Sequence, residues 1–206
     1  LKELGKKYRE VEEIALGSEM LEDRFKGVGK LSKEKAKEYG VVGPTARASG
    51  IKEDTRKRSP YSAYGELDFE VPVESAGDAY ARMLIRLREI WESIHMIEQV
   101  IDNLPKGKVQ SIRTLIVSKE GSAGSVVEAP RGENFHYVIA GKKAPVFSRV
   151  RPPTLANLAA MPVMLKGHWL SDVPVVISSI DPCFACTDRV FVVDLDKGEV
   201  RRVEFD

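Results

Sequence analysis

The hydrophobic and polar positions in the first half of the chain follow a helical period. Over residues 77–104 apolar side chains recur at three- and four-residue spacing, and Asp78 is a suitable N-cap. This apolar stripe consists of Tyr80, Met83, Leu84, Leu87, Trp91, Ile94, Ile97 and Ile101. Pro105 and Gly107 end the pattern. The sequence therefore predicts one long helix, with the stripe facing a protein core rather than a cofactor.

The segments before this helix are shorter or irregular. Residues 2–26 predict a helix, and its apolar face carries Leu4, Tyr8, Val11, Ile14 and Ala15. Ser32 resembles the N-cap of a short helix that runs to Tyr39 and ends at Gly40. Residues 40–76 are rich in Gly, Pro, Ser and charge and show no period. A long irregular segment in a compact domain is usually functional or lies against a partner.

After residue 107 the pattern becomes that of strands. Short β-rich runs are expected at 126–128, 135–139 and 144–148. Helices are expected from Pro152-Pro153-Thr154 to about Leu165, and from Leu170 to Ser178. Residues 190–193 and 199–203 flank Asp196-Lys197-Gly198, which predicts a hairpin.

Together these elements predict an α+β fold. It would be a helical bundle around one long helix, with a small antiparallel β region and a C-terminal β hairpin. We expect a single domain over 1–206. Its expected parts are a mainly helical part over 1–107, a β-rich part over 108–151, helices with the cysteines over 152–189, and a C-terminal extension over 190–206.

Composition narrows the class of protein. Hydrophobic residues make up 43% and charged residues 31%, which is typical of a folded soluble chain. The net charge of +1, with both signs interspersed, argues against a nucleic-acid partner. Two cysteines favour a reducing cytoplasmic setting over a secreted disulfide framework, and abundant Lys, Glu and Arg are typical of a thermophile. The chain lacks an initial Met and a signal-peptide pattern, so we expect a fragment or part of a longer protein.

Both cysteines lie in one short segment near the C-terminus. Cys183 and Cys186 have the Cys-x-x-Cys spacing that lets two thiols bind one soft metal or close a disulfide. Arg189 and nearby peptide dipoles could lower their pKa values. A zinc site needs about four ligands, and the three histidines (His95, His136 and His168) are not at zinc-ligand spacing. The pair therefore does dithiol chemistry alone or forms half of a metal site, and we favour the half-site.

The neighbours of the cysteines carry a family resemblance. Residues 172–189 resemble the C-terminal signature of the large subunits of membrane-bound, energy-converting nickel–iron hydrogenases. Further segments similar to that group, and to the homologous quinone-site subunit of respiratory complex I, are 23–29, 43–50, 60–64 and 68–73. The complex I relatives generally lack the C-terminal cysteine pair. Its presence here points to the hydrogenase side.

The resemblance implies roles for the residues of the site. In that family the first cysteine, here Cys183, is a terminal nickel ligand, and the second, here Cys186, bridges nickel and iron. The iron carries cyanide and carbon monoxide ligands. Arg131 matches the arginine that donates to a cyanide, and Pro130 and Thr154 are expected to contact the diatomic ligands, Thr154 through its hydroxyl. Thiolates and a fixed guanidinium suit these tasks, although Arg131 alone would be interpreted as a turn arginine in solvent.

Other charged residues are more ambiguous. Candidates for a proton path are Glu128, Glu133 and His136. For the histidine the competing interpretation is a buried, hydrogen-bonded position in a strand. Arg47, Asp54 and Arg56 either contact a small subunit or membrane arm, or form a solvated charged loop.

Two features depart from the family pattern. The upstream Cys-x-x-Cys pair that supplies the other two thiolates is absent, so the N-terminal part of a large subunit must provide them. Family members are often trimmed after the residue that corresponds to Arg189, whereas residues 190–206 remain here. The tail implies a precursor, with a maturation protease and a nickel chaperone as partners, or a relative that is never trimmed.

The resemblance implies an oxidoreductase that forms H2 reversibly. Electrons would come from iron–sulfur clusters of a small subunit, and membrane subunits would translocate ions, with this chain peripheral on the cytoplasmic side. A cysteine thiolate would accept the proton. One alternative is a related sulfur reductase that uses Cys183 and Cys186 as a redox dithiol. Another is a non-catalytic, complex I-like quinone module with vestigial cysteines.

Overall fold

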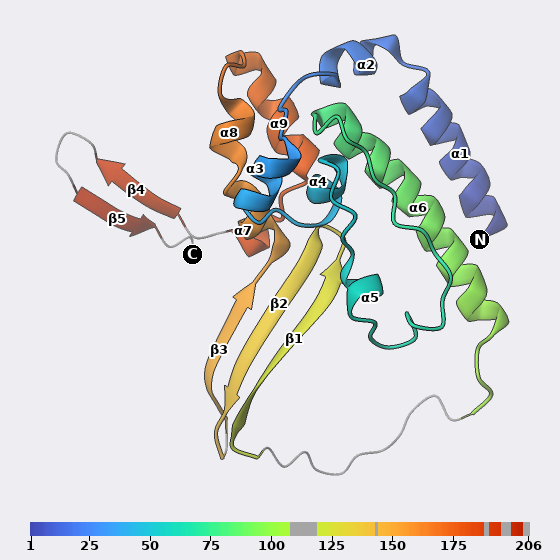
Figure 1. Cartoon of the computed structure of the whole chain (residues 1–206), viewed down its shortest axis with the longest axis vertical. Coiled ribbons are helices and arrows are strands. Elements are labelled where there is room, and N and C mark those ends of the chain that lie inside the picture. The colour runs from blue at the N-terminus through green and yellow to red at the C-terminus, as the bar shows by residue number, and fades with distance from the viewer. Residues whose placement is uncertain (108–118, 143, 188–189, 195–198, 204–206) are drawn as a thin grey trace.

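A computed structural model shows an α+β arrangement, as the sequence predicts (Figure 1). It describes residues 1–107, 119–142, 144–187, 190–194 and 199–203. The helices of the first half are α1 (Lys2–Leu16), α2 (Glu19–Phe25), α3 (Lys33–Glu38), α4 (Gly43–Ala48), α5 (Thr55–Arg58) and α6 (Ala79–Asp102). Those of the second half are α7 (Pro153–Leu158), α8 (Met161–Leu165), η1 (Leu170–Asp172), α9 (Val173–Ile180) and η2 (Phe184–Cys186).

The strands form two antiparallel sheets. The larger sheet has the order β1 (Gly121–Ala129), β2 (Gly132–Ala140) and β3 (Pro145–Arg151). Its strands are longer than the sequence predicts, and Glu128 pairs with Glu133 beside the β1–β2 turn. The predicted C-terminal hairpin is confirmed as β4 (Val190–Asp194) and β5 (Glu199–Val203). In Figure 1 the β1–β2 turn reaches the group of short helices that includes α3, α4, α7 and α9.

Several helices differ from their predicted extents. The helix expected over 2–26 is wrong as a single element, because the chain breaks at Gly17 and Ser18. The Ser18 hydroxyl accepts a hydrogen bond from the Leu21 N–H and caps α2. The apolar period continues across this cap, so the period alone does not reveal the break. The caps at Ser32 and Asp78 are confirmed. The segment 40–76 is not wholly irregular, since it contains α4 and α5.

The most buried face of α6 is not the predicted stripe. Of that stripe Ile94 is buried, five residues (Tyr80, Met83, Leu84, Leu87 and Trp91) are half-buried, and Ile97 and Ile101 are 44% and 59% exposed. The face that packs inward instead carries Ala81 and Ile85, which contact Ala48 of α4. The prediction is therefore confirmed only in part, because neighbouring elements decide which face of a helix is covered.

The main apolar core lies among α3, α4, α8 and α9. Its buried members are Leu31, Ala36, Val41, Ala46, Ala160, Met161, Met164, Val176 and Ile180. Ile180 is the last residue of α9 and is 1% exposed. This core therefore fixes the point at which the chain leaves α9 toward the cysteines.

Two glycines bring the β1–β2 turn against α4. Gly43 has φ +64, and a Cβ there would lie 2.4 Å from the Arg131 carbonyl oxygen. A Cβ on Gly132, whose φ is +123, would lie 2.6 Å from the Gly43 nitrogen. The backbone of Arg131 can lie this close to α4 only because both positions lack a side chain.

We predict that Gly43→Ala destabilises the protein by about 2–4 kcal/mol, because it combines a positive φ with a backbone overlap. The measurement is the free energy of unfolding by chemical denaturation. Gly107→Ala is the matched control, since a Cβ there meets nothing within 4 Å. Equal stability of the two variants would contradict the close packing.

A second prediction concerns the contact between α1 and α6. The Tyr8 hydroxyl donates to the Leu87 carbonyl oxygen at 2.7 Å, and the ring packs edge-on against Trp91. Burial, with the charge of Glu12, raises the pKa of Tyr8 from its ordinary value of 10.0 to about 12. The folded state therefore holds the phenolic proton more tightly than the unfolded state.

The stabilisation by Tyr8 should be complete below about pH 10 and lost as the pH rises toward 12. Urea titrations across this range should show the free energy of unfolding falling more steeply for the wild type than for Tyr8→Phe. Parallel curves would show that the phenol contributes nothing to the pH dependence.

Candidate functional site

The two thiols lie together just after α9. Asp181 ends that helix in the left-handed conformation, at φ 54, and Pro182 follows, so the chain turns sharply into η2. The Sγ atoms of Cys183 and Cys186 are 3.0 Å apart and are not joined in a disulfide. Both side chains are partly exposed. The sequence prediction that the pair converges is therefore met by the geometry.

The surroundings of Cys183 favour its thiolate. A hydrogen bond from the Cys186 side chain, and then the backbone of Cys186, lower the pKa of the Cys183 thiol. The positive charge of Arg131 acts in the same direction, and burial opposes it. A thiolate is the form that binds metal or attacks a disulfide.

The Arg131 side chain is held against Asp181, two residues before Cys183. Its Nε donates to the Asp181 carbonyl oxygen, and its Nη2 donates to Asp181 Oδ1 at 3.1 Å. The interpretation as a turn arginine in solvent is therefore wrong. The β1–β2 turn and the end of α9, 50 residues apart, are joined through this side chain.

Helix α7 holds the backbone of both Cys183 and Arg131. Thr154, in its first turn, is 1% exposed, and its Oγ1 accepts the Cys183 N–H at 3.1 Å. Accepting this bond leaves the hydroxyl able to donate another. Asn157 lies one turn later and donates to the Arg131 carbonyl oxygen at 3.4 Å. Its Oδ1 accepts the Val42 N–H at 2.9 Å. The sequence prediction missed Asn157, whose only signal is its spacing of three residues from Thr154.

The remaining candidates lie elsewhere. Glu133 forms ion pairs with Arg58 and Arg151. His136 is exposed on β2, so the interpretation as a buried strand histidine is wrong. Arg189 lies outside the described residues. Neither Glu133 nor His136 is joined to the thiols by a described hydrogen bond.

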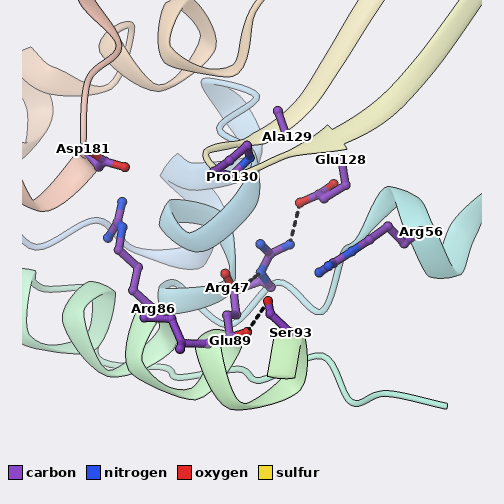
Figure 2. Close-up of a pocket in the computed structure, with 10 residues that line it drawn as sticks. Arg47, Arg56, Arg86, Glu89, Ser93, Glu128, Ala129, Pro130 and Asp181 are labelled. Atoms are coloured by element: carbon purple, nitrogen blue, oxygen red, sulfur yellow. Dashed lines mark hydrogen bonds and ion pairs between the residues drawn. The ribbon is translucent and has the colours of Figure 1, made fainter. Parts of the chain in front are cut away.

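Arg47 lies at the centre of a buried ion cluster, which is drawn in part in Figure 2. The side chain is 2% exposed. Its Nε lies 2.6 Å from Glu89 Oε1, and its Nη1 lies 3.0 Å from Glu128 Oε1 and 3.5 Å from Asp54 Oδ2. The interpretation as a solvated charged loop is wrong for Arg47 and Asp54, because their charges meet inside the protein.

The same cluster sets the ionisation of its carboxyl groups. Burial acts to raise the pKa of Asp54, but hydrogen bonds and charge from Arg56, with the charge of Arg47, hold it below its usual value. At Glu89 burial prevails over Arg47, and the pKa is raised. We refer to Arg47, Asp54, Arg56, Glu89 and Glu128 as the Arg47 cluster.

A cavity of about 360 Å³ adjoins this cluster and extends to Asp181, two residues before Cys183. The lining residues are Arg47, Arg56, Arg86, Glu89, Ile90, Ser93, Glu128, Ala129, Pro130 and Asp181. Pro130, which precedes Arg131, and Asp181, two residues before Cys183, line this cavity, and Glu89 and Arg86 line it from α6 (Figure 2).

The donor set fits part of a soft-metal centre. Two thiols converge, and one has a lowered pKa, as a thiolate ligand requires. Within the described ranges no group of three or more His, Cys, Asp or Glu side chains is arranged to hold a metal. The cysteines could therefore supply two ligands and would need others. None of the helices in the described part is long and apolar enough to cross a membrane.

Sequence comparison places the chain in a class of oxidoreductase subunits. A model of the family described as the respiratory-chain NADH dehydrogenase 49 kDa subunit matches residues 1–120 and 110–189. The chain therefore belongs to that family, and the resemblance inferred from the motifs is confirmed.

Similar curated proteins include both hydrogenase and complex I subunits. Membrane-bound hydrogenase subunit alpha of Pyrococcus furiosus is 40% identical over 95% of this chain and 50% of its own length. An NADH-quinone oxidoreductase subunit of Solibacter usitatus is 38% identical over 89% of this chain and 50% of its own length. Formate hydrogenlyase subunit 5 of Escherichia coli is 34% identical over 98% of this chain and 36% of its own length. The chain thus spans between about a third and a half of these relatives.

We predict that Arg47→Met lowers the free energy of unfolding by about 3–5 kcal/mol, because it leaves buried carboxylates without a counter-charge. Chemical denaturation at neutral pH measures the loss. Arg88→Met on α6 is the control, since the Arg88 side chain of its ion pair with Glu74 is 50% exposed. A loss no greater than that of the control would show that the Arg47 cluster adds little stability.

Proposed function

We propose that this chain is part of the catalytic large subunit of an energy-converting nickel–iron hydrogenase. The observation that carries the proposal is the convergence of Cys183 and Cys186, whose sulfur atoms are 3.0 Å apart beside Arg131. Hydrogenase relatives support it, including the carbon monoxide-induced hydrogenase of Rhodospirillum rubrum at 39% identity over 81% of this chain.

In this proposal Cys183 and Cys186 are two of the thiolate ligands of a nickel–iron centre. When bound, that centre would supply the redox chemistry of reversible H2 formation. The Arg131 guanidinium and the Thr154 hydroxyl would donate to cyanide ligands on the iron, and Pro130 would close the same side. The lowered pKa of Cys183 suits its Sγ for holding and releasing a proton.

We also propose that a proton path leads to the thiols, and one of its three candidate residues has more support than the other two. Of the three candidates we favour Glu128, because it lines the cavity that also reaches Asp181. Both of its carboxylate oxygens are engaged, one by Arg47 and one by the Thr55 N–H. Glu133 and His136 have no described contact that supports this role.

The proposed setting is a multisubunit membrane complex. The N-terminal part of a large subunit would supply the other two thiolates, and a small subunit would carry the iron–sulfur clusters. Membrane subunits would translocate ions, and this chain would lie peripherally on the cytoplasmic side. A nickel chaperone and a maturation protease acting at Arg189 would be partners of the unprocessed chain.

A second candidate function is sulfur reduction by a redox dithiol. It is favoured by the close approach of the thiols and the lowered pKa of Cys183, which also suit disulfide exchange. A complex I-like quinone module without cysteine chemistry is the third, supported by the NADH-quinone oxidoreductase relatives.

The test is the nickel content of the intact purified complex. The hydrogenase proposal predicts about one nickel per complex in the wild type and at least a tenfold loss in Cys183→Ser and Cys186→Ser, which each remove a ligand. Ser148→Ala on β3 is the control and should retain the metal.

Absence of nickel from a wild-type complex that reduces sulfur compounds would contradict the hydrogenase proposal. If the cysteine variants then lose that activity, the dithiol function holds. If they keep full activity in quinone reduction, the cysteines are vestigial.

A further inference from the structure

Arg86, on α6, has a buried donor nitrogen without a hydrogen-bond partner among the described residues, unlike its neighbour Arg82. Its Nη1 donates to the Arg82 carbonyl oxygen at 3.1 Å. Its Nη2 is buried and has no hydrogen-bond partner among the described residues. Arg82, one turn earlier on α6, is fully buried, yet its Nε, Nη1 and Nη2 all donate to protein oxygens at 2.8–2.9 Å.

The carboxylates around the cavity are already engaged by other arginines. Glu89 and Glu128 each bind Arg47, and Asp181 binds Arg131. Figure 2 shows the Arg86 side chain extending from α6 toward Asp181, on the opposite side of the view from Arg56. Among the described residues that line the cavity, Arg86 is the arginine without an ion pair.

This position is energetically unfavourable for an unpaired cation. Burial lowers the pKa of Arg86, and the charges of Asp181 and Glu89 only partly oppose it. A buried guanidinium nitrogen without an acceptor loses its hydration and gains nothing in return. A carboxylate would supply both a counter-charge and an acceptor, and the cavity of about 360 Å³ has room for a small one.

We propose that the cavity between α6 and the end of β1 binds a carboxylate, with Arg86 Nη2 as its principal donor. The carboxylate belongs either to a small free anion or to an acidic side chain of another polypeptide segment, and the recognition chemistry is the same. The bound group lies beside Asp181, two residues before Cys183, and does not depend on a metal being present.

The first arm tests a free anion, with sodium formate as the probe. Thermal unfolding of the purified complex is followed with formate or chloride at equal ionic strength. The wild type should show a saturable rise in Tm of about 2–4 °C with formate. Arg86→Met should lose this rise, and Arg88→Met should keep it. An equal rise in the wild type and Arg86→Met would overturn a free anion at Arg86.

The second arm tests an acidic side chain from elsewhere. The conservative variant R86K is treated with a carbodiimide, which joins an amine to a carboxylate in contact with it, and the joined peptides are identified by mass spectrometry. A link to a carboxylate other than Glu89, Glu128 or Asp181 identifies a polypeptide source. If formate has no effect that depends on Arg86 and no such link forms, the proposal is wrong.

Discussion

The arrangement of the site depends on the buried charge of Arg47. This one guanidinium, on α4, contacts carboxylates from α6, from the segment before α5 and from β1, so three separate parts of the chain share a single counter-ion. Glu128 lies two residues before Pro130, and Arg131 follows directly. The ion cluster therefore anchors the end of β1 from which Arg131 extends, and a charged side chain with no described bond to the thiols sets where the site arginine can lie.

From that anchor the contacts continue to the thiols. Gly43 and Gly132 allow the β1–β2 turn to pack on α4, and Arg131 then bonds both the backbone and the carboxylate of Asp181. On the other side, the core around Ile180 holds α9, and Thr154 fixes the backbone of Cys183. The thiol pair is thus positioned from two directions by packed and hydrogen-bonded elements, as a centre with demanding ligand geometry requires.

The sequence revealed those parts of this arrangement that have a local signature. The caps at Ser32 and Asp78, the long helix and the C-terminal hairpin follow from propensity and period, and the motif around the cysteines led to Arg131 and Thr154. The most buried face of α6 and the partners of Arg47 could not be predicted, because both depend on which distant elements pack there. A charged residue in an irregular segment has the same sequence pattern whether it meets water or a remote carboxylate.

The most direct test of the account is the infrared spectrum of the purified complex in the region where metal-bound cyanide and carbon monoxide absorb. The account predicts bands of both ligands, with the cyanide bands shifted in Arg131→Lys and in Thr154→Val, because each variant alters a proposed donor. A spectrum without such bands, from a complex that is fully assembled and active, would contradict a nickel–iron centre at Cys183 and Cys186.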